Sequence, residues 1–536
     1  MIKYIRIIFK SGEIMNRKKV FLITMTGILT VALIIGASFG IYSLAVIFGT
    51  TSITLDTEKT YQTMEGFGAS SAWIYQSFGA VEDEEIKEQA MEMLYGDSGL
   101  CLNTFRYNIG AGGSEVYEYG DPLRGSKSFF KTEVAEEILD GKKDYSAFKD
   151  INNYDFSKDK EVLDLFEMAL AKGNIDKVVF FANSPHYTMT LNGKAHGEEI
   201  QQNNLKEECY EAFCDYLIVI TDYIYKNVIS KYDKNIEVVI SPVNEPQWDW
   251  GGDGASQEGC HYDPKPLAKF YQQFYTSLSE YNKKNSTKFE MDIFESGNYK
   301  MIGSSDTKLN EYMQEFKKYP FFESLTNISV HSYGTDTDKF LRTLFDNYMD
   351  RNFDDLKVSV TEYCVFEGGV DKSIDMGLYS AKVILRDLAM IDAVSWNYWL
   401  SISTYDYEDG LIYWNKDSDG KDILNAYKRY YAMGHFSKYI PDGSVRIEVS
   451  YSDTLGFNGV ECVAYQRPDG SIAMVVINDS ERSHKINIKG GYENIEEVLT
   501  TEEENWKISE YKNGGSITIP SKSIATYIFT SSQISA

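Results

Sequence analysis

The chain has 536 residues, which is long enough for one large domain and a smaller one. Its hydrophobic and charged fractions, 43% and 25%, are those of an ordinary globular protein, so extended disorder is not expected. The formal net charge of −27 argues against nucleic acid and anionic lipid as partners, because no basic surface is available to pair with phosphates. The 40 Tyr, 29 Phe and 7 Trp suit sugar stacking, but they suit barrel cores and sheet faces equally well.

Neither the cysteines nor the histidines form a ligand pattern. The six cysteines, at positions 101, 209, 214, 260, 364 and 462, include no CxxC pair, and the six histidines include no HExxH. We therefore expect no structural zinc and no disulfide framework, and leave an isolated bridge open. We expect neither a metal nor an organic cofactor.

The first 48 residues have the pattern of an export signal or membrane anchor. Residues 20–48 contain no charged side chain, and three basic residues, 17–19, precede them. This run exceeds the roughly 7–15 residues of a secretory signal core and reaches the about 20 residues that span a bilayer. A signal anchor and a long cleavable signal both remain open, with Met1 or Met15 as the start. Either one predicts an extracellular location for the rest of the chain, secreted or anchored to the cell surface.

From residue 65 to residue 398, short apolar segments alternate with longer amphipathic ones. Strands that alternate with helices form a parallel sheet, and eight such units predict a closed (β/α)8 TIM barrel over residues 65–431. An open doubly wound sheet is the alternative. A polar insertion at 110–155 is long for a connecting loop and predicts an excursion on the binding face. The expected strands are 65–73, 101–109, 177–182, 238–241, 289–294, 328–330, 358–361 and 393–398; the expected helices are 86–94, 160–172, 205–229, 266–281, 309–316, 339–348 and 374–390.

Beyond residue 432 the pattern changes to strands alone. This predicts a C-terminal β-sandwich over residues 432–536. Residues 51–63 alternate polar and β-branched side chains, as a short exposed strand or hairpin does, and have no partner in the barrel. We therefore expect the N-terminal strands, 49–64, to join the sandwich and bring the two ends of the chain together. The expected C-terminal strands are 445–450, 460–466, 472–478, 484–488, 496–500 and 516–530.

The fourth barrel strand leads into a candidate site. Pro242 ends its regular hydrogen bonding, because proline has no N–H, and Asn244, Glu245 and Pro246 follow. A carboxylate at the C-terminal end of a parallel barrel strand lies where barrel enzymes keep their chemistry. An ordinary turn after a strand is the alternative.

A second carboxylate, Glu362, ends the seventh strand and could face Glu245 across the barrel mouth. Two such groups are the minimum apparatus for glycoside hydrolysis, because one must protonate the leaving oxygen and the other must attack the anomeric carbon. Asn244 could hold a sugar 2-hydroxyl, and Arg106 could keep Glu362 ionised. In the alternative interpretation these charges form ordinary ion pairs and Trp396 fills the barrel core.

Short motifs in a fixed order carry a family resemblance: residues 66–70 (GFGAS), 105–110 (FRYNIG), 183–185 (NSP), 241–246 (SPVNEP), 330–333 (VHSY), 361–363 (TEY) and the exit 427–437. Together they resemble glycoside hydrolase family 30 over roughly residues 51–530. The resemblance implies a retaining mechanism in which Glu245 matches the acid/base and Glu362 the nucleophile. It also implies a side sandwich built from both chain ends.

Within that family, residues 246–250 and 257–262 look most like the endo-β-1,6-galactanase branch. Branches that act on β-1,6-glucan, glucuronoxylan or glucosylceramide share the same catalytic pair. His186 stands where the family's Asn-Ser-Pro-Pro-Tyr run has its second proline, which could alter a subsite. The candidate substrate contacts are Trp73, Arg106, Asn183, Asn244, Trp248, Trp250, Tyr262, His331, Tyr333 and Trp396.

The resulting hypothesis is an exported, monomeric, endo-acting glycosidase that hydrolyses β-1,6-galactan side chains by double displacement. Its expected partner is a polysaccharide or oligosaccharide, and membrane contact is expected through the N-terminal segment alone. The alternatives are another β-glycan as substrate, and a catalytically inactive surface protein that binds glycans. The C-terminal sandwich could also be a binding module, which its aromatic residues do not decide.

Overall fold

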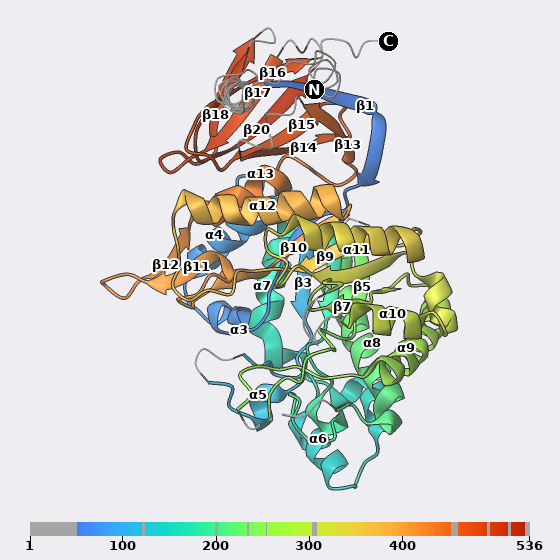
Figure 1. Cartoon of the computed structure of the whole chain (residues 1–536). Helices are drawn as coiled ribbons and strands as arrows, with labels where there is room; N and C mark the ends of the chain where they lie inside the picture. Colours follow the sequence, from blue (N-terminus) through green and yellow to red (C-terminus); the bar gives the residue numbers. More distant parts are fainter. Residues whose placement is uncertain are drawn as a thin grey trace, which may run out of the picture.

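The computed structural model describes residues 51–120, 124–198, 202–232, 235–252, 254–302, 308–451, 459–489, 492, 494–512 and 516–530. The predicted export segment, 1–48, lies outside these residues. None of the described helices is both long and apolar enough to cross a membrane. The described chain forms a barrel and a second, β-rich part that packs on α12 and α13 (Figure 1).

The barrel is a ring of parallel strands. Each strand pairs with its sequence neighbour, and the last, β10, pairs with the first, β2. The fifth strand of the ring is interrupted at residues 292–293. Its first piece, β6, pairs with β5, and its second piece, β7, pairs with β8. The TIM barrel is confirmed and the open sheet is wrong, because an open sheet leaves its first and last strands unpaired. The strands are β2 (Gly66–Ser70), β3 (Thr104–Asn108), β4 (Lys177–Phe181), β5 (Glu237–Ser241), β6 (Glu290–Met291), β7 (Phe294–Ser296), β8 (Asn327–His331), β9 (Lys357–Glu362) and β10 (Ser395–Ser403).

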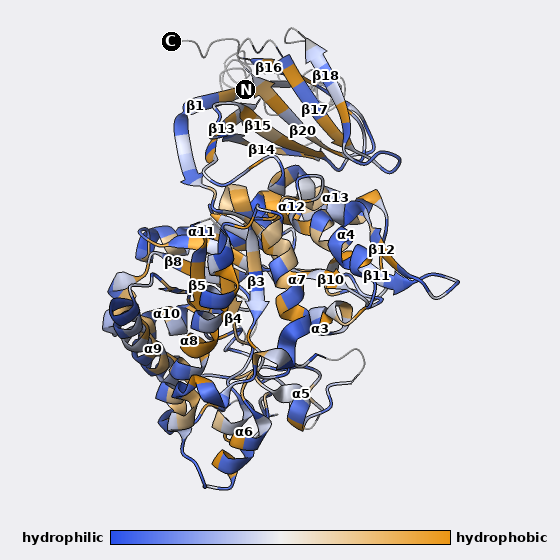
Figure 2. Cartoon of the chain, turned by 180° about the vertical axis from the view of Figure 1, so that it is seen from behind, coloured by the Kyte–Doolittle hydropathy of each residue, from blue (hydrophilic) through white to orange (hydrophobic). Residues whose placement is uncertain are grey.

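Amphipathic helices cover the ring. In α4 the side chain of Asp83 accepts the N–H groups of Glu85 and Ile86, which caps the helix start. The apolar residues of α4 recur every four positions and face inward, which leaves its polar residues on the outer face. Figure 2 shows a hydrophilic outer face on α9 as well. The helices are α3 (Ile74–Gly79), α4 (Glu84–Tyr95), α7 (Lys160–Ala171), α8 (Tyr210–Asn227), α9 (Pro264–Asn285), α10 (Leu309–Phe316), α11 (Lys339–Asn352), α12 (Ile374–Met390) and α13 (Lys428–Ser437).

The predicted helices are found with ends shifted by a few residues. The exception is α8, expected from 205, because Leu205 forms an isolated bridge with Thr190 and a 3-10 turn, Glu207–Cys209, precedes the helix. The insertion at 110–155 follows β3 and is not a bare polar loop. It contains α5 (Gly113–Val116), α6 (Thr132–Leu139) and an aromatic core in which Phe130 stacks on Phe148 at 3.9 Å.

The second part is a nine-stranded β-sandwich that includes the N-terminal strand. β1 (Thr51–Thr63) is one long strand, with Ile53 buried and Asp56 exposed. It pairs antiparallel with β13 and parallel with β16, so the predicted union of the two chain ends is confirmed. The remaining strands are β13 (Val445–Tyr451), β14 (Val460–Gln466), β15 (Ile472–Asn478), β16 (His484–Lys489), β17 (Asn494–Thr500), β18 (Lys507–Lys512), β19 (Ile517–Ile519) and β20 (Ser523–Thr530).

Four strand predictions were incomplete. The expected strand 289–294 is two short strands, β6 and β7, separated at residues 292–293. The expected strand 516–530 is two strands, β19 and β20, because Pro520 offers no N–H and Lys522 adopts a left-handed φ of 44°. β18 was not expected, nor was the hairpin of β11 (Gly410–Lys416) and β12 (Asp422–Ala426), which extends the barrel sheet from β10.

Candidate active site

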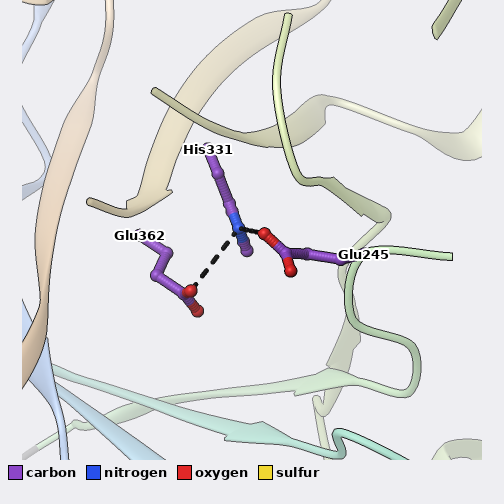
Figure 3. A group of neighbouring side chains, drawn as sticks. All are labelled: Glu245, His331 and Glu362. Carbon is purple, nitrogen blue, oxygen red and sulfur yellow. Dashed lines mark hydrogen bonds and ion pairs between the residues drawn. The ribbon is translucent and has the colours of Figure 1, made fainter. Parts of the chain in front are cut away.

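Four strands bring ionisable side chains to one point at their carboxyl ends. His331 and Glu362 are the last residues of β8 and β9, Glu295 lies in β7, and Glu245 follows β5. All four are buried. Figure 3 shows Glu245, His331 and Glu362 pointing toward one another. The two carboxylates expected to face each other across the barrel mouth therefore do so.

The carboxylates of Glu245 and Glu362 are close. One oxygen of each lies within 4.8 Å of the other and of His331 Nδ1. Glycosidases that retain anomeric configuration separate these groups by about 5–5.5 Å, whereas inverting enzymes need about 6.5–9.5 Å to admit a water. Oxygens this close agree with retention and not with the wider spacing of inverting enzymes.

His331 connects three carboxylates. Its Nδ1 lies 2.8 Å from Glu245 Oε1 and 3.6 Å from Glu362 Oε1, and its Nε2 lies 2.9 Å from Glu295 Oε2. Burial lowers the pKa of His331, but the three carboxylates outweigh burial and raise it to about 10. The imidazolium therefore donates from both nitrogens at neutral pH. A metal ion at Glu245, His331 and Glu362 would need the lone pair that this proton occupies.

Arg106 lies under the pair as the second buried cation. Its Nη1 is 3.3 Å from Glu362 Oε2 and its Nη2 is 3.3 Å from Glu295 Oε1. Burial raises the pKa of Glu295, but Arg106 and His331 outweigh burial and hold it at about 2. Glu295 therefore carries a fixed negative charge. The sequence analysis missed this residue, although the same strand-end rule that selected Glu245 applies to it.

Glu362 has two donors on its carboxylate. Tyr333 Oη donates to its Oε1 at 2.9 Å and Arg106 to its Oε2. Burial raises the pKa of Glu362 and the Glu245 carboxylate adds to this effect, whereas His331 and Arg106 lower it. The net pKa lies above its usual value. The predicted contact with Arg106 is confirmed, but it does not outweigh the burial.

The backbone is strained at Glu245 and at Glu295. Glu245 has a φ of 44° and Glu295 a φ of 52°, in the left-handed region that non-glycine residues rarely adopt. The Glu245 N–H donates to the Glu295 carbonyl at 2.9 Å, and Trp250 Nε1 donates to the Glu245 carbonyl at 3.1 Å. Such outliers persist where surrounding contacts hold them, and they gather at active sites.

A pocket of about 250 Å³ opens onto the carboxylates. Its walls are largely aromatic, and the ring of Phe366 lies 4.4 Å from that of Tyr333 with 62% of the residue exposed. Phe366, Gln257 and Trp399 were not among the predicted contacts. The lining residues are Asn244, Glu245, Trp248, Trp250, Gln257, Gly297, Tyr333, Glu362, Phe366 and Trp399.

The ten predicted contacts do not all reach the pocket. Asn244, Trp248, Trp250 and Tyr333 line the pocket, and Arg106 and His331 hold its carboxylates. Trp73 lies behind the wall, with its ring edge-on to Trp399 at 5.4 Å. Asn183 is buried beyond the end of β4 and is not among the lining residues.

Two predicted contacts are wrong. Trp396 is fully buried and its Nε1 donates to Asp387 on α12, so it packs between barrel and helix. Trp399, three residues on along β10, lines the pocket instead, because successive side chains of a strand alternate in direction. Tyr262 is buried against Phe270 of α9, and its carbonyl accepts from Tyr312 Oη.

The comparisons with known proteins agree with this geometry. The model of O-glycosyl hydrolase family 30 matches residues 50–413, and that of the glycosyl hydrolase family 30 beta sandwich domain matches residues 443–527. The chain belongs to glycoside hydrolase family 30. With the carboxylate separation, this membership makes it a retaining O-glycosyl hydrolase.

Individual relatives are distant. An endo-β-1,6-galactanase of Hypocrea rufa is 24% identical over 73% of this chain and 75% of that protein. An exo-β-1,6-galactobiohydrolase of Bifidobacterium longum is 27% identical over 45% of this chain but 18% of that longer protein. A conserved exported protein of Bacteroides fragilis shares the fold with a TM-score of 0.74, at 21% identity over 89% of this chain and all of that one.

Family 30 enzymes with other substrates share the fold as well. A xylanase of Talaromyces cellulolyticus has a TM-score of 0.64, at 19% identity over 90% of this chain and all of that one. An endo-β-1,6-glucanase has a TM-score of 0.60, at 18% identity over 89% of this chain and 94% of that one. The fold therefore does not select among these sugars.

Proposed function

We propose that this family 30 hydrolase is an endo-acting β-1,6-galactanase in which Glu245 is the acid/base and Glu362 the nucleophile. The approach of the two carboxylates to within 4.8 Å carries the reaction class. The choice of galactan is supported by the similarity to the Hypocrea rufa enzyme over nearly three quarters of both chains.

The two carboxylates suffice for both steps of the hydrolysis. Glu362 attacks the anomeric carbon while the bond to the leaving oxygen breaks, and Glu245 gives that oxygen its proton. A covalent glycosyl-enzyme results. Glu245, now ionised, takes a proton from a water that attacks the same carbon and releases Glu362.

The contacts of the two carboxylates support these roles. Glu362 is fixed by Arg106 and Tyr333, as a nucleophile must be for in-line attack. Within the described part of the chain, the Glu245 side chain has His331 as its hydrogen-bond partner, on Oε1. Glu245 lines the pocket, and its second carboxylate oxygen is left to carry the transferable proton.

One side chain in the pocket is suited to a sugar hydroxyl. Asn244 is buried beside Glu245 and lines the pocket, and its Oδ1 has no hydrogen-bond partner among the described residues. A buried amide oxygen without a partner costs free energy that a bound hydroxyl recovers. Trp248, Trp250 and Trp399 supply the faces on which sugar rings stack.

Azide rescue tests the catalytic roles. Glu245→Ala should give a β-azide product, because azide replaces water on the glycosyl-enzyme. Glu362→Ala should give an α-azide product, because azide then attacks the substrate directly. The reverse pattern would exchange the roles, and near-normal turnover of an unactivated glycan by either variant would exclude the pair.

Digestion of β-1,6-galactan, β-1,6-glucan and glucuronoxylan tests the substrate. A ladder of β-1,6-galacto-oligosaccharides supports an endo-galactanase. A single short product would make the action exo, and preferential cleavage of another glycan would replace the substrate. Binding without any new reducing ends would favour a glycan-binding protein.

The same proposal includes export. A polysaccharide does not enter a cell intact, and the basic flank and apolar run of residues 17–48 are typical of an export signal. We expect the enzyme in the medium or on the cell surface, with the mature N-terminus deciding between a cleaved signal and an anchor. Activity confined to the cytoplasmic fraction would contradict this expectation.

A further inference from the structure

Glu295 is a charged side chain beside the catalytic pair that no step of the proposed reaction uses. It is fully buried. It lines neither the pocket of about 250 Å³ nor the larger cavity, of about 760 Å³, at the amino ends of the strands. Because the carboxylate is closed off from both spaces, a glycan in the pocket does not contact it. A buried carboxylate in this position calls for a function other than substrate binding.

Both oxygens of Glu295 are occupied by hydrogen-bond donors. Oε1 accepts from Arg106 Nη2 at 3.3 Å and from Ser241 Oγ at 2.9 Å. Oε2 accepts from His331 Nε2 at 2.9 Å and from Thr361 Oγ1. An ionised carboxylate has about four acceptor positions, so none is left for a proton. The donors come from β3, β5, β8 and β9, and together they hold Glu295 as an anion.

Glu295 reaches the acid/base through His331 and through the backbone. It holds His331 Nε2, and this directs Nδ1 to Glu245 Oε1 at 2.8 Å. An ionised carboxylate on Nε2 also favours the imidazolium form of the ring. The Glu245 N–H donates to the Glu295 carbonyl at 2.9 Å. Contacts therefore connect Glu295 to both the position and the charge of the acid/base.

The cluster holds two cations and three carboxylates. The cations are Arg106 and His331, and the carboxylates that they contact are Glu245, Glu295 and Glu362. An uncompensated buried charge is strongly unfavourable, so two carboxylates are ionised and the third keeps a proton.

The numbers of donors decide which carboxylate keeps this proton. Glu295 has four donors and stays ionised. Burial and the charge of Glu245 raise the pKa of Glu362, so these two carboxylates compete for the proton. Within the described residues Glu362 accepts from Arg106 and Tyr333, whereas Glu245 accepts from one donor. The proton therefore resides on Glu245.

Three further ionisable groups face Glu295. They are Glu362 on β9, Asp292 in the break between β6 and β7, and Tyr271 on α9. Burial raises the pKa of Tyr271 well above its usual value, so the phenol is neutral. Asp292 accepts from the neutral hydroxyl of Ser329 and shares no donor with Glu295. The charge count therefore rests on the two cations and the three carboxylates that they contact.

We propose that Glu295 is a positioning residue whose fixed negative charge keeps a proton on the catalytic pair by compensating one of the two buried cations. With Glu295 ionised, one carboxylate of the pair compensates the other cation, and Glu245 keeps the proton that the leaving oxygen needs. Without this charge, both catalytic carboxylates ionise against Arg106 and His331, and the acid is lost. The inference rests on the proposed role of Glu245 as the acid/base.

The test compares Glu295→Gln with the wild type on two substrates that differ in their leaving group. One is the polysaccharide that the wild type cleaves, and the other is the nitrophenyl glycoside of an oligosaccharide that it releases. Nitrophenolate leaves without a proton, so its departure does not need the acid. We expect kcat/KM on the polysaccharide to fall at least about 10²-fold, the contribution of a general acid. On the nitrophenyl glycoside we expect a few-fold change.

The pH dependence gives a second measurement on the same variant. A lower pKa of the acid moves the basic limb of kcat/KM on the polysaccharide to lower pH, because the acid must be protonated in the free enzyme. Equal losses on the two substrates, or superimposable pH profiles of Glu295→Gln and the wild type, would overturn the proposal.

A double variant separates charge from packing. Glu295→Gln combined with His331→Gln removes one anion and one cation, so it restores the charge count and leaves no carboxylate or cation in excess. We expect it to recover the wild-type ratio of the two kcat/KM values, at a lower overall rate. The double variant also provides the test where Glu295→Gln alone does not fold. A selective loss on the polysaccharide as large as that expected for Glu295→Gln would contradict the proposal.

Asp159→Asn is the matched control. It neutralises a buried carboxylate that is bonded to Tyr107 Oη at 2.9 Å and does not contact the cluster. The ratio of the two kcat/KM values should remain that of the wild type, and a change equal to that of Glu295→Gln would contradict the proposal. Full turnover of the polysaccharide by Glu245→Ala would instead contradict the proposed function.

Discussion

The barrel has an upper mouth, at the carboxyl ends of its eight strands, and a lower mouth, at their amino ends. The two mouths differ in how deeply their charged side chains are buried. At the upper mouth Arg106, His331, Glu295 and Glu362 are buried against one another around a pocket of about 250 Å³. At the lower mouth the ion pairs around Glu65 are partly exposed, and the cavity is larger, about 760 Å³. The smaller pocket has the chemistry, because buried charges interact strongly and shift one another's pKa, whereas water screens the exposed pairs.

The largest difference between the mouths is expected in turnover. Glu362→Ala or Glu245→Ala should lower kcat at least about 10²–10⁴-fold, the contribution of a positioned acid or base. Glu65→Gln, at the lower mouth, should leave kcat near the wild-type value. Steady-state rates on the cleaved polysaccharide measure both. An equal loss in Glu65→Gln would remove the functional distinction between the mouths.

The next difference is expected in stability. Arg106→Met leaves Glu295 and Glu362 buried with one of their two cations removed, and breaking a buried pair costs about 3–5 kcal/mol. Lys357→Met removes a half-exposed partner of Glu65, and such surface pairs contribute about 0–1 kcal/mol. Urea unfolding of both variants gives the comparison. Similar free energies of unfolding for the two would show that burial does not set the strength of these pairs.

The pH dependence of stability should follow the buried cluster. The pKa of His331 is raised from 6.5 to about 10, so its contribution is complete below pH 6.5 and is lost as the pH rises through 10. The pKa of Glu295 is lowered from 4.5 to about 2, so its contribution is present above pH 4.5 and is lost as the pH falls to 2. Urea unfolding across pH measures both limbs. His331→Gln should abolish the alkaline loss, and Glu65→Gln should leave it intact.

The smallest expected effect concerns substrate stacking at the upper mouth. Phe366→Ala should raise KM for the polysaccharide by a few-fold, since one aromatic contact contributes about 0.5–1.5 kcal/mol. Phe340→Ala on α11 is the matched control, because Phe340 is 61% exposed and Phe366 62%, and Phe340 does not line the pocket. Michaelis–Menten kinetics of the two variants decide the point, and equal KM values would exclude stacking on Phe366.

The alternation of strands and helices, the eightfold count and the return of β1 to the C-terminal sheet all follow from local patterns in the sequence. The positions of Glu245 and Glu362 follow as well, because the end of a strand is marked by residues such as Pro242 that cannot continue it. Family motifs then point to the same two carboxylates, and the family models match both parts of the chain.

The directions in which side chains point could not be predicted from the sequence. The strands of a parallel barrel are buried on both faces, so polar alternation does not mark which side points inward. The sequence alone could not choose between Trp396 and Trp399, and the chosen one packs against α12. Tyr262 lies in the loop just before α9, where no periodicity marks the side that faces the core, so the sequence could not identify it as a core residue.

The sequence by itself determined the fold class, the family and the two carboxylates, because these depend on periodicity and on residues close together along the chain. Only the tertiary structure decided that His331 donates to both Glu245 and Glu295, that Arg106 spans Glu295 and Glu362, and that a polar cavity reaches Thr361 from below. These groups come from strands far apart in sequence. Their charges depend on distances and burial that the closed ring alone sets.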